Sequence, residues 1–183
     1  SFLNYRGWWG VSGFNLADVS SLVNGPMLPF ATMITCGTGS FASDETSLSE
    51  SLLRSGTISV PKGAIAAIGT ATSGTHTMYN NLVDMGIYWG LFPGGAQTAG
   101  ESLVHGKLHL IKTYPENSGN FVNIFSHWNN LMGDPATHLW TDIPRELMVN
   151  YNSNLSLGSN FIEINVKDEN NNPVEDAWVT LLM

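Results

Sequence analysis

Two short apolar runs constrain the fold of this chain more than any other feature. The first covers Leu28–Cys36 (LPFATMITC) and the second covers Gly63–Gly69 (GAIAAIG). Neither run alternates apolar with polar residues, which is the pattern of a strand buried on both of its faces. Strands of that kind occur in parallel sheets that helices cover on both sides. The two runs therefore predict the central strands of an α/β domain.

Segments with helical character lie before, between and after these two strands. Leucines at helical spacing predict a helix over Ser47–Gly56, and further helices are expected over residues 17–25, 82–92 and 98–113. Another strand is expected over Ser1–Arg6. The order strand, loop, helix, strand, loop, helix is the βαβ rhythm of an α/β domain. In such a sheet the loops that follow the parallel strands meet at one edge, where binding and catalytic sites form.

The sequence changes character after Pro144. Residues 146–183 alternate apolar with polar side chains in FIEINVKD and AWVTLLM, and the turn-rich segment DENNNP joins these two stretches. Alternation interrupted by Asn and Pro turns is typical of antiparallel strands. This part of the chain is therefore expected to open a β-sandwich, separate from the α/β domain.

Composition excludes several classes of partner. Hydrophobic residues make up 43% of the chain and charged residues only 12%, which favours a globular fold with a sizeable core. The formal net charge is −8, and the 7 Lys and Arg residues form no cluster, so no nucleic-acid partner is expected. No segment reaches the ~18 consecutive apolar residues that a membrane-spanning helix needs. No signal peptide is present in this segment either.

Cys36 is the one cysteine of the chain, which excludes an internal disulfide and a multi-cysteine zinc site. It ends the first apolar run and is followed by Gly37-Thr38-Gly39. A side chain there is expected to point into the crevice at the sheet edge, where small neighbours let a substrate backbone approach. The N–H groups of the turn are also candidates to stabilise an oxyanion. A nucleophile and a packed strand-end thiol both remain open interpretations of the local sequence.

Several motifs together resemble the gingipain family of cysteine peptidases, which has a caspase-like fold. In chain order they are NYRG at 4–7, MITCGTGSF at 33–41, SESLLR at 49–54, KGAIAAIG at 62–69 and NNLMGDPATHLW at 129–140. The resemblance implies that residues 1–148 are the C-terminal part of an α/β peptidase domain with a mostly parallel sheet and flanking helices. It implies that residues 149–183 begin an all-β immunoglobulin-like sandwich.

The resemblance also implies a set of site residues and partners. Cys36 would be the nucleophile, Gly37 and Gly7 would donate to an oxyanion or support the site, and Glu50 matches a helix carboxylate of the family. The dipole at a helix N-terminus is by itself a sufficient reason for Glu50. The substrate would be a protein or peptide, the missing N-terminal part of the same domain would be a partner, and the protein would be secreted or held at the cell surface.

One position departs from the family pattern. The family has Gly-His-Gly after its Asn-Tyr strand, whereas this chain has Gly7-Trp8-Trp9-Gly10, so Trp8 stands where the catalytic histidine belongs. Indole is not a base, so it cannot take a proton from the thiol or return one to the leaving amine. Trp8 and Trp9 would instead form a hydrophobic wall beside the substrate or pack against the sheet.

Another histidine is a candidate for the missing base. His76 lies in the loop after the Gly63–Gly69 strand, so it is expected at the same sheet edge as Cys36. A loop histidine bonded to a neighbouring backbone group is the alternative interpretation.

The leading interpretation is therefore a cysteine endopeptidase that acts through Cys36 and is impaired by Trp8. A catalytically inactive pseudopeptidase that serves as a binding or structural module is one alternative. A surface adhesin or assembly component, in which the domain only carries the appended sandwich, is the other. No cofactor is required. No metal site is expected, because His105 and His109, although at metal-ligand spacing, have no third ligand nearby, and structural calcium is implied by the resemblance alone.

Overall fold

The computed structural model describes residues 1–5, 13–143, 145–154, 156–158 and 161–180. The chain divides into two units, Ser1–Thr141 and Asp142–Met183, and each is treated by itself. The boundary expected from the sequence, between residues 148 and 149, lies inside the second unit. That this unit begins an immunoglobulin-like domain stays a prediction.

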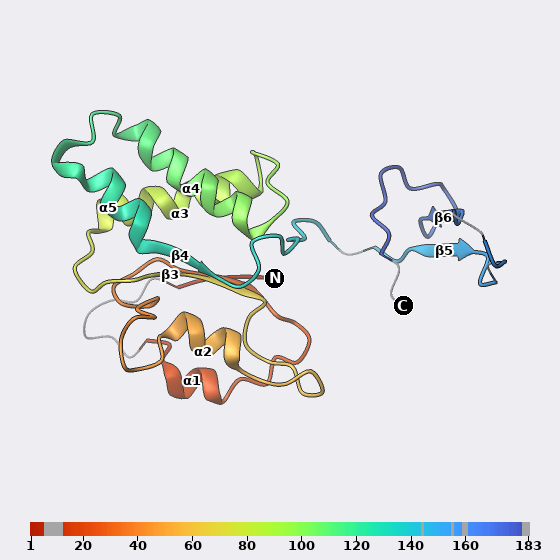
Figure 1. Cartoon of the computed structure of the whole chain (residues 1–183), viewed down its shortest axis with the longest axis horizontal. Helices are drawn as coiled ribbons and strands as arrows, with labels where there is room; N and C mark the ends of the chain where they lie inside the picture. The colour runs from red at the N-terminus through yellow and green to blue at the C-terminus, as the bar shows by residue number, and fades with distance from the viewer. Residues whose placement is uncertain (6–12, 144, 155, 159–160, 181–183) are drawn as a thin grey trace. The chain divides into compact units, whose positions relative to one another are not determined.

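The first unit is built on a four-stranded sheet in the order β1-β2-β3-β4 (Figure 1). Strands β1 (Phe2–Asn4), β2 (Phe30–Met33) and β3 (Ala66–Thr70) run parallel, and β4 (Asn129–Met132) pairs antiparallel with β3. Every residue of β2 and β3 is buried, as the two apolar runs predict. The mixed α/β class with a mostly parallel sheet is confirmed.

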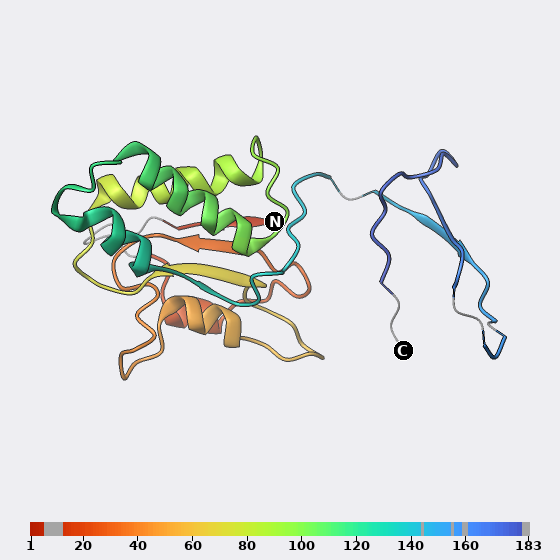
Figure 2. The ribbon, with the colours of Figure 1, turned by 45° about the horizontal axis from the view of Figure 1, so that its top comes forward.

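Helices cover both faces of this sheet (Figure 2). One face carries α3 (Thr77–Leu91), α4 (Ala99–Thr113) and α5 (Phe121–Trp128), which follows the short 3-10 turn η1 (Ser118–Asn120). The opposite face carries α1 (Leu16–Ser20) and α2 (Leu48–Arg54). The sheet is thus the middle layer of three, which explains why its central strands contain almost no exposed positions.

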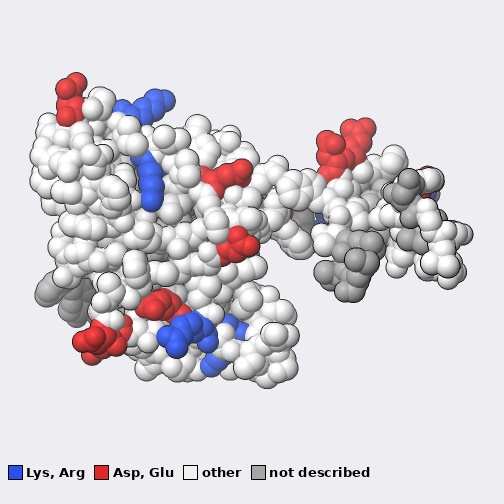
Figure 3. Space-filling view, viewed as in Figure 1, with Lys and Arg blue, Asp and Glu red and all other residues white. Residues whose placement is uncertain are grey.

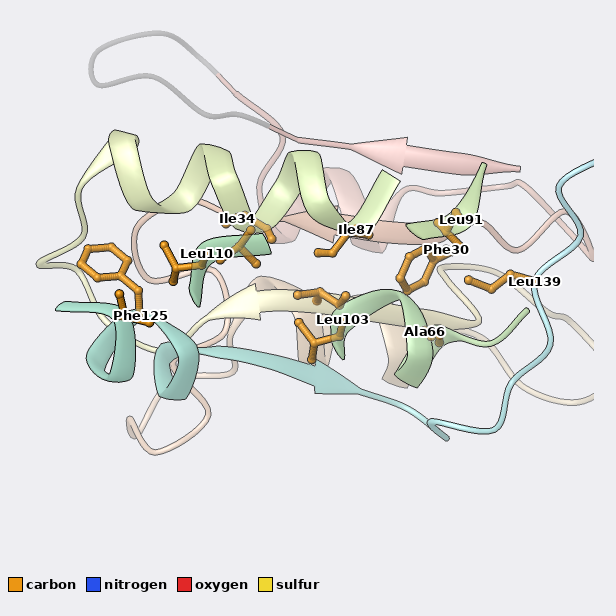
Figure 4. Packing of buried hydrophobic residues seen from close by; sticks show 13 residues of the cluster. Phe30, Ile34, Ala66, Ile87, Leu91, Leu103, Leu110, Phe125 and Leu139 are labelled. Atoms are coloured by element: carbon orange, nitrogen blue, oxygen red, sulfur yellow. The ribbon is translucent and has the colours of Figure 1, made fainter. Parts of the chain in front are cut away.

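Two apolar clusters hold the layers together. The strands contribute side chains to both clusters, because successive side chains of a strand point to opposite faces of the sheet. Phe30 of β2 packs with Ile87 and Leu103 under α3 and α4, as Figure 4 shows. Ala31 and Met33, its neighbours on the same strand, pack with α1 and α2 instead. Burial on both sides fixes the register of β2, because a slip by one residue would exchange the two sets of side chains.

The second unit contains a two-stranded antiparallel sheet of β5 (Met148–Tyr151) and β6 (Ile164–Lys167). Antiparallel pairing agrees with the alternating sequence of this region. All four residues of β5 are exposed.

The distribution of basic side chains and the length of the helices can be compared with the expectation of no nucleic-acid partner and no membrane span. On the face shown in Figure 3, the described Lys and Arg side chains lie in separate small groups, and one of these groups adjoins acidic side chains. None of the helices in the described part of the chain is long and apolar enough to cross a membrane.

Candidate active site

A cavity of about 660 Å³ opens at the carboxyl ends of the parallel strands. Tyr5, which follows β1, and Ser73, which follows β3, contribute to its wall. Between them lies the turn after β2, including Cys36. Since three consecutive parallel strands end here, the cavity lies where open α/β sheets bind their ligands.

Cys36 is half-buried and lines this cavity. Strand β2 ends at Met33, so Cys36 lies in the turn beyond the strand and not at its last residue. Its Sγ atom is 2.9 Å from Oγ1 of Thr75, and either atom can be the donor. A thiolate can only accept, so the Thr75 hydroxyl would donate to the ionised form of Cys36.

Backbone hydrogen bonds hold the turn after β2 that contains Cys36, Gly37 and Gly39 (the cysteine turn) against the end of β3 and the segment that follows it. The N–H of Gly37 donates to the carbonyl of Thr72 at 2.7 Å, and the N–H of Gly39 donates to the carbonyl of Thr70 at 3.0 Å. These bonds extend the contact between the chain after β2 and the end of β3, at Thr70, and the residues that follow it. They bring Cys36 next to Thr75.

The bond from Gly37 favours a support role over an oxyanion role, the two roles that the resemblance implies for this residue. Its N–H is already used by the Thr72 carbonyl, so Gly37 supports the turn; its φ of 71° is a conformation that favours glycine. The N–H of Cys36 itself has no acceptor among the residues that the structure describes. That N–H is the better candidate for an oxyanion donor in this turn.

Thr38 organises the turn, and the sequence analysis did not single it out. Its hydroxyl lies within hydrogen-bond distance of the carbonyls of Met33 and Thr35 and accepts from the N–H of Thr70 at 3.2 Å. Its carbonyl accepts from both the N–H and the hydroxyl of Ser49, at 2.9 and 2.8 Å. A buried threonine between two glycines after a buried strand was the available signal, because a buried hydroxyl must find partners.

Glu50 caps the helix that follows the cysteine turn. Its carboxylate accepts from the N–H and the hydroxyl of Ser47 at 2.8 and 2.7 Å, and Ser47 Oγ accepts from the N–H of Glu50 at 3.4 Å. This reciprocal arrangement is a capping box. The two bonds from Ser47, the backbone one first, hold the pKa of Glu50 below its ordinary value of 4.5. Ser47 lines the cavity, so Glu50 fixes one part of its wall.

We expect Glu50→Ala to lower the free energy of unfolding at pH 7 by about 1 kcal/mol, the usual value of a helix cap. A lowered pKa in the folded state stabilises the fold above pH 4.5, and this stabilisation is lost as the pH falls below that value. The difference between the variant and the parent should therefore shrink in urea titrations at acid pH. Glu45→Ala, in the exposed part of the same loop, is the control. If the difference in free energy of unfolding between Glu50→Ala and the parent did not change with pH, the capping role of the Glu50 carboxylate would be contradicted.

His76 begins α3 and acts as its N-cap. Nδ1 of its ring accepts from the N–H of Met78 at 3.2 Å, and the ring contacts Tyr79 edge-on with 6.0 Å between centroids. A neutral imidazole that accepts through Nδ1 carries its proton on Nε2, so it has no second lone pair for a thiol proton. The thiol contact goes to the preceding residue, Thr75. The role of His76 as the base stays a prediction that requires the cap to open.

Three expected site residues, Gly7, Trp8 and Trp9, lie outside the described residues, and the predictions about them stand as made. Within the described ranges, no group of three or more His, Cys, Asp or Glu side chains is placed to hold a metal ion. Structural calcium likewise stays a prediction.

Comparisons of the sequence with a family model and with a known protein both match cysteine peptidases of one family. The model of a family described as Peptidase family C25 matches residues 1–140. Gingipain R2 of Porphyromonas gingivalis is 24% identical over 178 residues, which cover 90% of this chain and 23% of that protein.

Two solved structures share the fold. The crystal structure of the Arg-specific cysteine proteinase gingipain R matches with a TM-score of 0.71 and 22% identity, over 90% of this chain and 38% of that one. A complex of Porphyromonas gingivalis RgpB pro- and mature domains matches with a TM-score of 0.74 and 22% identity, over 91% and 40%. The chain therefore spans less than half the length of each of these relatives.

Proposed function

Because the chain belongs to peptidase family C25, we propose that it carries the nucleophile of a cysteine endopeptidase and that Cys36 is that nucleophile. One observation carries the proposal: the half-buried thiol lines the cavity at the carboxyl ends of three parallel strands. A thiol that is only packed would lie within one of the two apolar clusters, and Cys36 belongs to neither of them.

The proposed reaction proceeds in two steps. The Cys36 thiolate attacks the scissile carbonyl carbon, and the carbonyl electron pair moves onto the oxygen, where the N–H of Cys36 donates to it. The C–N bond then breaks, and the amine leaves with a proton from water, which balances the proton that the thiol gave to water when it ionised; a thioester remains. Water attacks the thioester, which releases the carboxylic acid and restores the thiol.

The described residues include a nucleophile and a partner that can donate to its thiolate. They do not include a group in contact with Cys36 that can transfer the proton to the leaving amine. Thr75 can donate to the thiolate, but a hydroxyl is not a base at neutral pH, so it cannot replace imidazole in proton transfer. With tryptophan at position 8, we expect hydrolysis to be slow.

A catalytically inactive pseudopeptidase is the second candidate. Two observations favour it: the hydrogen bond of the thiol goes to the Thr75 hydroxyl, and Nδ1 of His76 is used to cap α3. In that case the cavity would bind a peptide without cleaving it.

Hydrolysis of quenched fluorescent peptides separates the two candidates. We expect slow cleavage by the parent chain and none by Cys36→Ala, because removal of the nucleophile abolishes acyl transfer. Equal signals from the parent and from Cys36→Ala would support the pseudopeptidase. The two proteins should have the same melting temperature, which shows that the comparison concerns chemistry and not folding.

Further features of the proposal come from the family. We propose that the substrate is a protein or peptide, that the N-terminal part of the same domain completes the site, and that the protein acts outside the cell or at its surface.

A further inference from the structure

We propose that the outer groove between α3 and α4 is a docking site for an amphipathic, acidic helix of another protein. The inference does not depend on the reaction at Cys36, and it adds an interaction surface to the chain. It begins from apolar side chains that these two helices leave exposed to solvent.

Both helices are apolar on two faces. Their inner faces contribute to the apolar cluster over the sheet, for example through Ile87 of α3 and Leu103 of α4. The exposed apolar residues lie three, four or seven positions apart along each helix: Met85 and Trp89 on α3, and Val104, Leu108 and Ile111 on α4. A surface helix normally presents polar side chains outward, and a helix that is apolar on both faces is normally covered on both. The outer faces therefore have the pattern of a surface that a partner covers.

A cavity of about 490 Å³ joins the two exposed series, and α3 and α4 lie side by side in both views (Figures 1 and 2). Its lining consists of Trp89 from α3 and of His105, Leu108, His109, Lys112 and Thr113 from α4. Glycines of α3 allow the two helices to approach closely. A Cβ on Gly86 would lie 2.5 Å from His109 Cβ, and a Cβ on Gly90 would lie 2.6 Å from His105 Cβ. Both histidines thus lie at the contact between the helices and form part of the groove wall.

The geometry of the groove suits a third helix. A helix fills the space between two neighbouring helices in helical bundles. The exposed series on α4 extends over seven residue steps, which is roughly 10 Å along the axis, or two turns. A partner helix with apolar side chains at i, i+4 and i+7 would cover both series. A small ligand in the cavity would leave Met85, Val104 and Ile111 uncovered, because they do not line it.

The charges of the groove favour an acidic partner. Lys112 and two histidines line the cavity, and none of its described lining residues is Asp or Glu. The whole chain has a formal net charge of −8, so this groove has the opposite balance. Glu101, one turn before His105, already accepts from the N–H groups of Gln97 and Thr98 in the cap of α4. Carboxylates at the edge of a partner helix can accept from Lys112 Nζ and from the imidazole N–H groups.

A second copy of the chain fits the groove less well. In a two-fold contact through this face, the basic groups of one groove would meet those of the other. Two chains that each carry a net charge of −8 also repel each other. The charges therefore favour a different protein, and self-association is measured as a separate outcome.

The test selects binders to the whole chain from a phage library of 18-residue helical peptides, in which the apolar face and its flanking positions are randomised. We expect the enriched peptides to carry apolar residues at i, i+4 and i+7. We also expect Asp or Glu at their flanks more often than Lys or Arg, because acidic flanks complement the groove. Enrichment of Lys or Arg at the flanks, or no enriched peptide, would overturn the inference.

Variants assign the enriched peptides to the groove. Leu108→Ser removes an apolar contact and Lys112→Gln removes a charge, both at exposed positions. Each should weaken binding by at least about fivefold in fluorescence anisotropy titrations. Ile58→Ser, at a fully exposed apolar position in the loop between α2 and β3, is the control and should leave binding unchanged. Equal binding by the parent and by both groove variants, with equal melting temperatures, would contradict the proposal.

Two further measurements identify other occupants of the groove. Sedimentation of the chain alone reports a second copy, and co-pelleting with phosphatidylcholine–phosphatidylglycerol vesicles reports a lipid surface. We expect a monomer that does not bind the vesicles. Self-association or vesicle binding that is lost in Leu108→Ser would assign the groove to that occupant and overturn the inference.

Discussion

Trp8→His is expected to raise the rate of Cys36-dependent peptide hydrolysis by about 10²- to 10⁴-fold, the usual contribution of general acid–base catalysis. By the resemblance of the NYRG segment to the Asn-Tyr strand of the family, this residue would stand where the family has its catalytic histidine. An imidazole there would take the thiol proton and then deliver it to the leaving amine, two steps that indole cannot perform. Initial rates on the fluorescent peptides, measured between pH 5 and 9, should show a limb near the ordinary pKa of histidine, about 6.5.

Trp9→His is the matched control, because it introduces the same side chain one residue later. It should leave hydrolysis at the level of the parent. If Trp8→His is no faster than this control, the site has lost more than its base, and the pseudopeptidase becomes the better description. If both variants hydrolyse the peptides faster than the parent by the same factor, the effect does not depend on placing the histidine at position 8.

Gly39→Ala is expected to lower the free energy of unfolding by about 3 kcal/mol, the upper end of the usual cost of overpacking. A Cβ atom on Gly39 would lie 2.7 Å from the carbonyl carbon of Gly69, in the backbone of β3. A backbone atom cannot rotate away, so the cysteine turn would have to move from the sheet. Two glycines thus allow the turn after β2 to lie directly on β3.

Urea denaturation measures this effect, and Gly74→Ala is the control. At Gly74 the nearest atom to an added Cβ is 3.9 Å away, at Thr72 Oγ1, and φ is not in the left-handed region. Removal of a glycine from such a position should leave stability unchanged or raise it by about 0.5 kcal/mol. Similar stability of Gly39→Ala and the parent would show that the turn is loosely packed.

Periodicity was sufficient to predict the framework of the fold. The apolar run at 28–36 contains β2, and the run at 63–69 contains β3 except for its last residue, Thr70. The expected helix at 98–113 coincides with α4 except for its cap, Thr98. The predicted ends of helices were less accurate where a side-chain cap determines the first residue of the helix. The helix expected from residue 82 begins at Thr77, because His76 caps it.

The site was only partly predictable, because spacing along the chain does not show which loops meet. Cys36 could be assigned to the sheet edge from the strand that precedes it. Its contact with Thr75 joins two loops 39 residues apart, and no local pattern indicates such a contact. The choice between an oxyanion role and a support role for Gly37 stayed open for the same reason: its N–H donates to the Thr72 carbonyl, a partner that only the fold reveals.

The reactivity of Cys36 with iodoacetamide in the folded chain, relative to the same chain in urea, tests the central claim most directly. The chain has one cysteine, so the mass increase reports this residue alone. A nucleophile that lines an open cavity and can accept from the Thr75 hydroxyl should react at least as fast in the folded chain as in urea at pH 7. Slower alkylation of the folded chain would show a packed structural thiol and contradict the account.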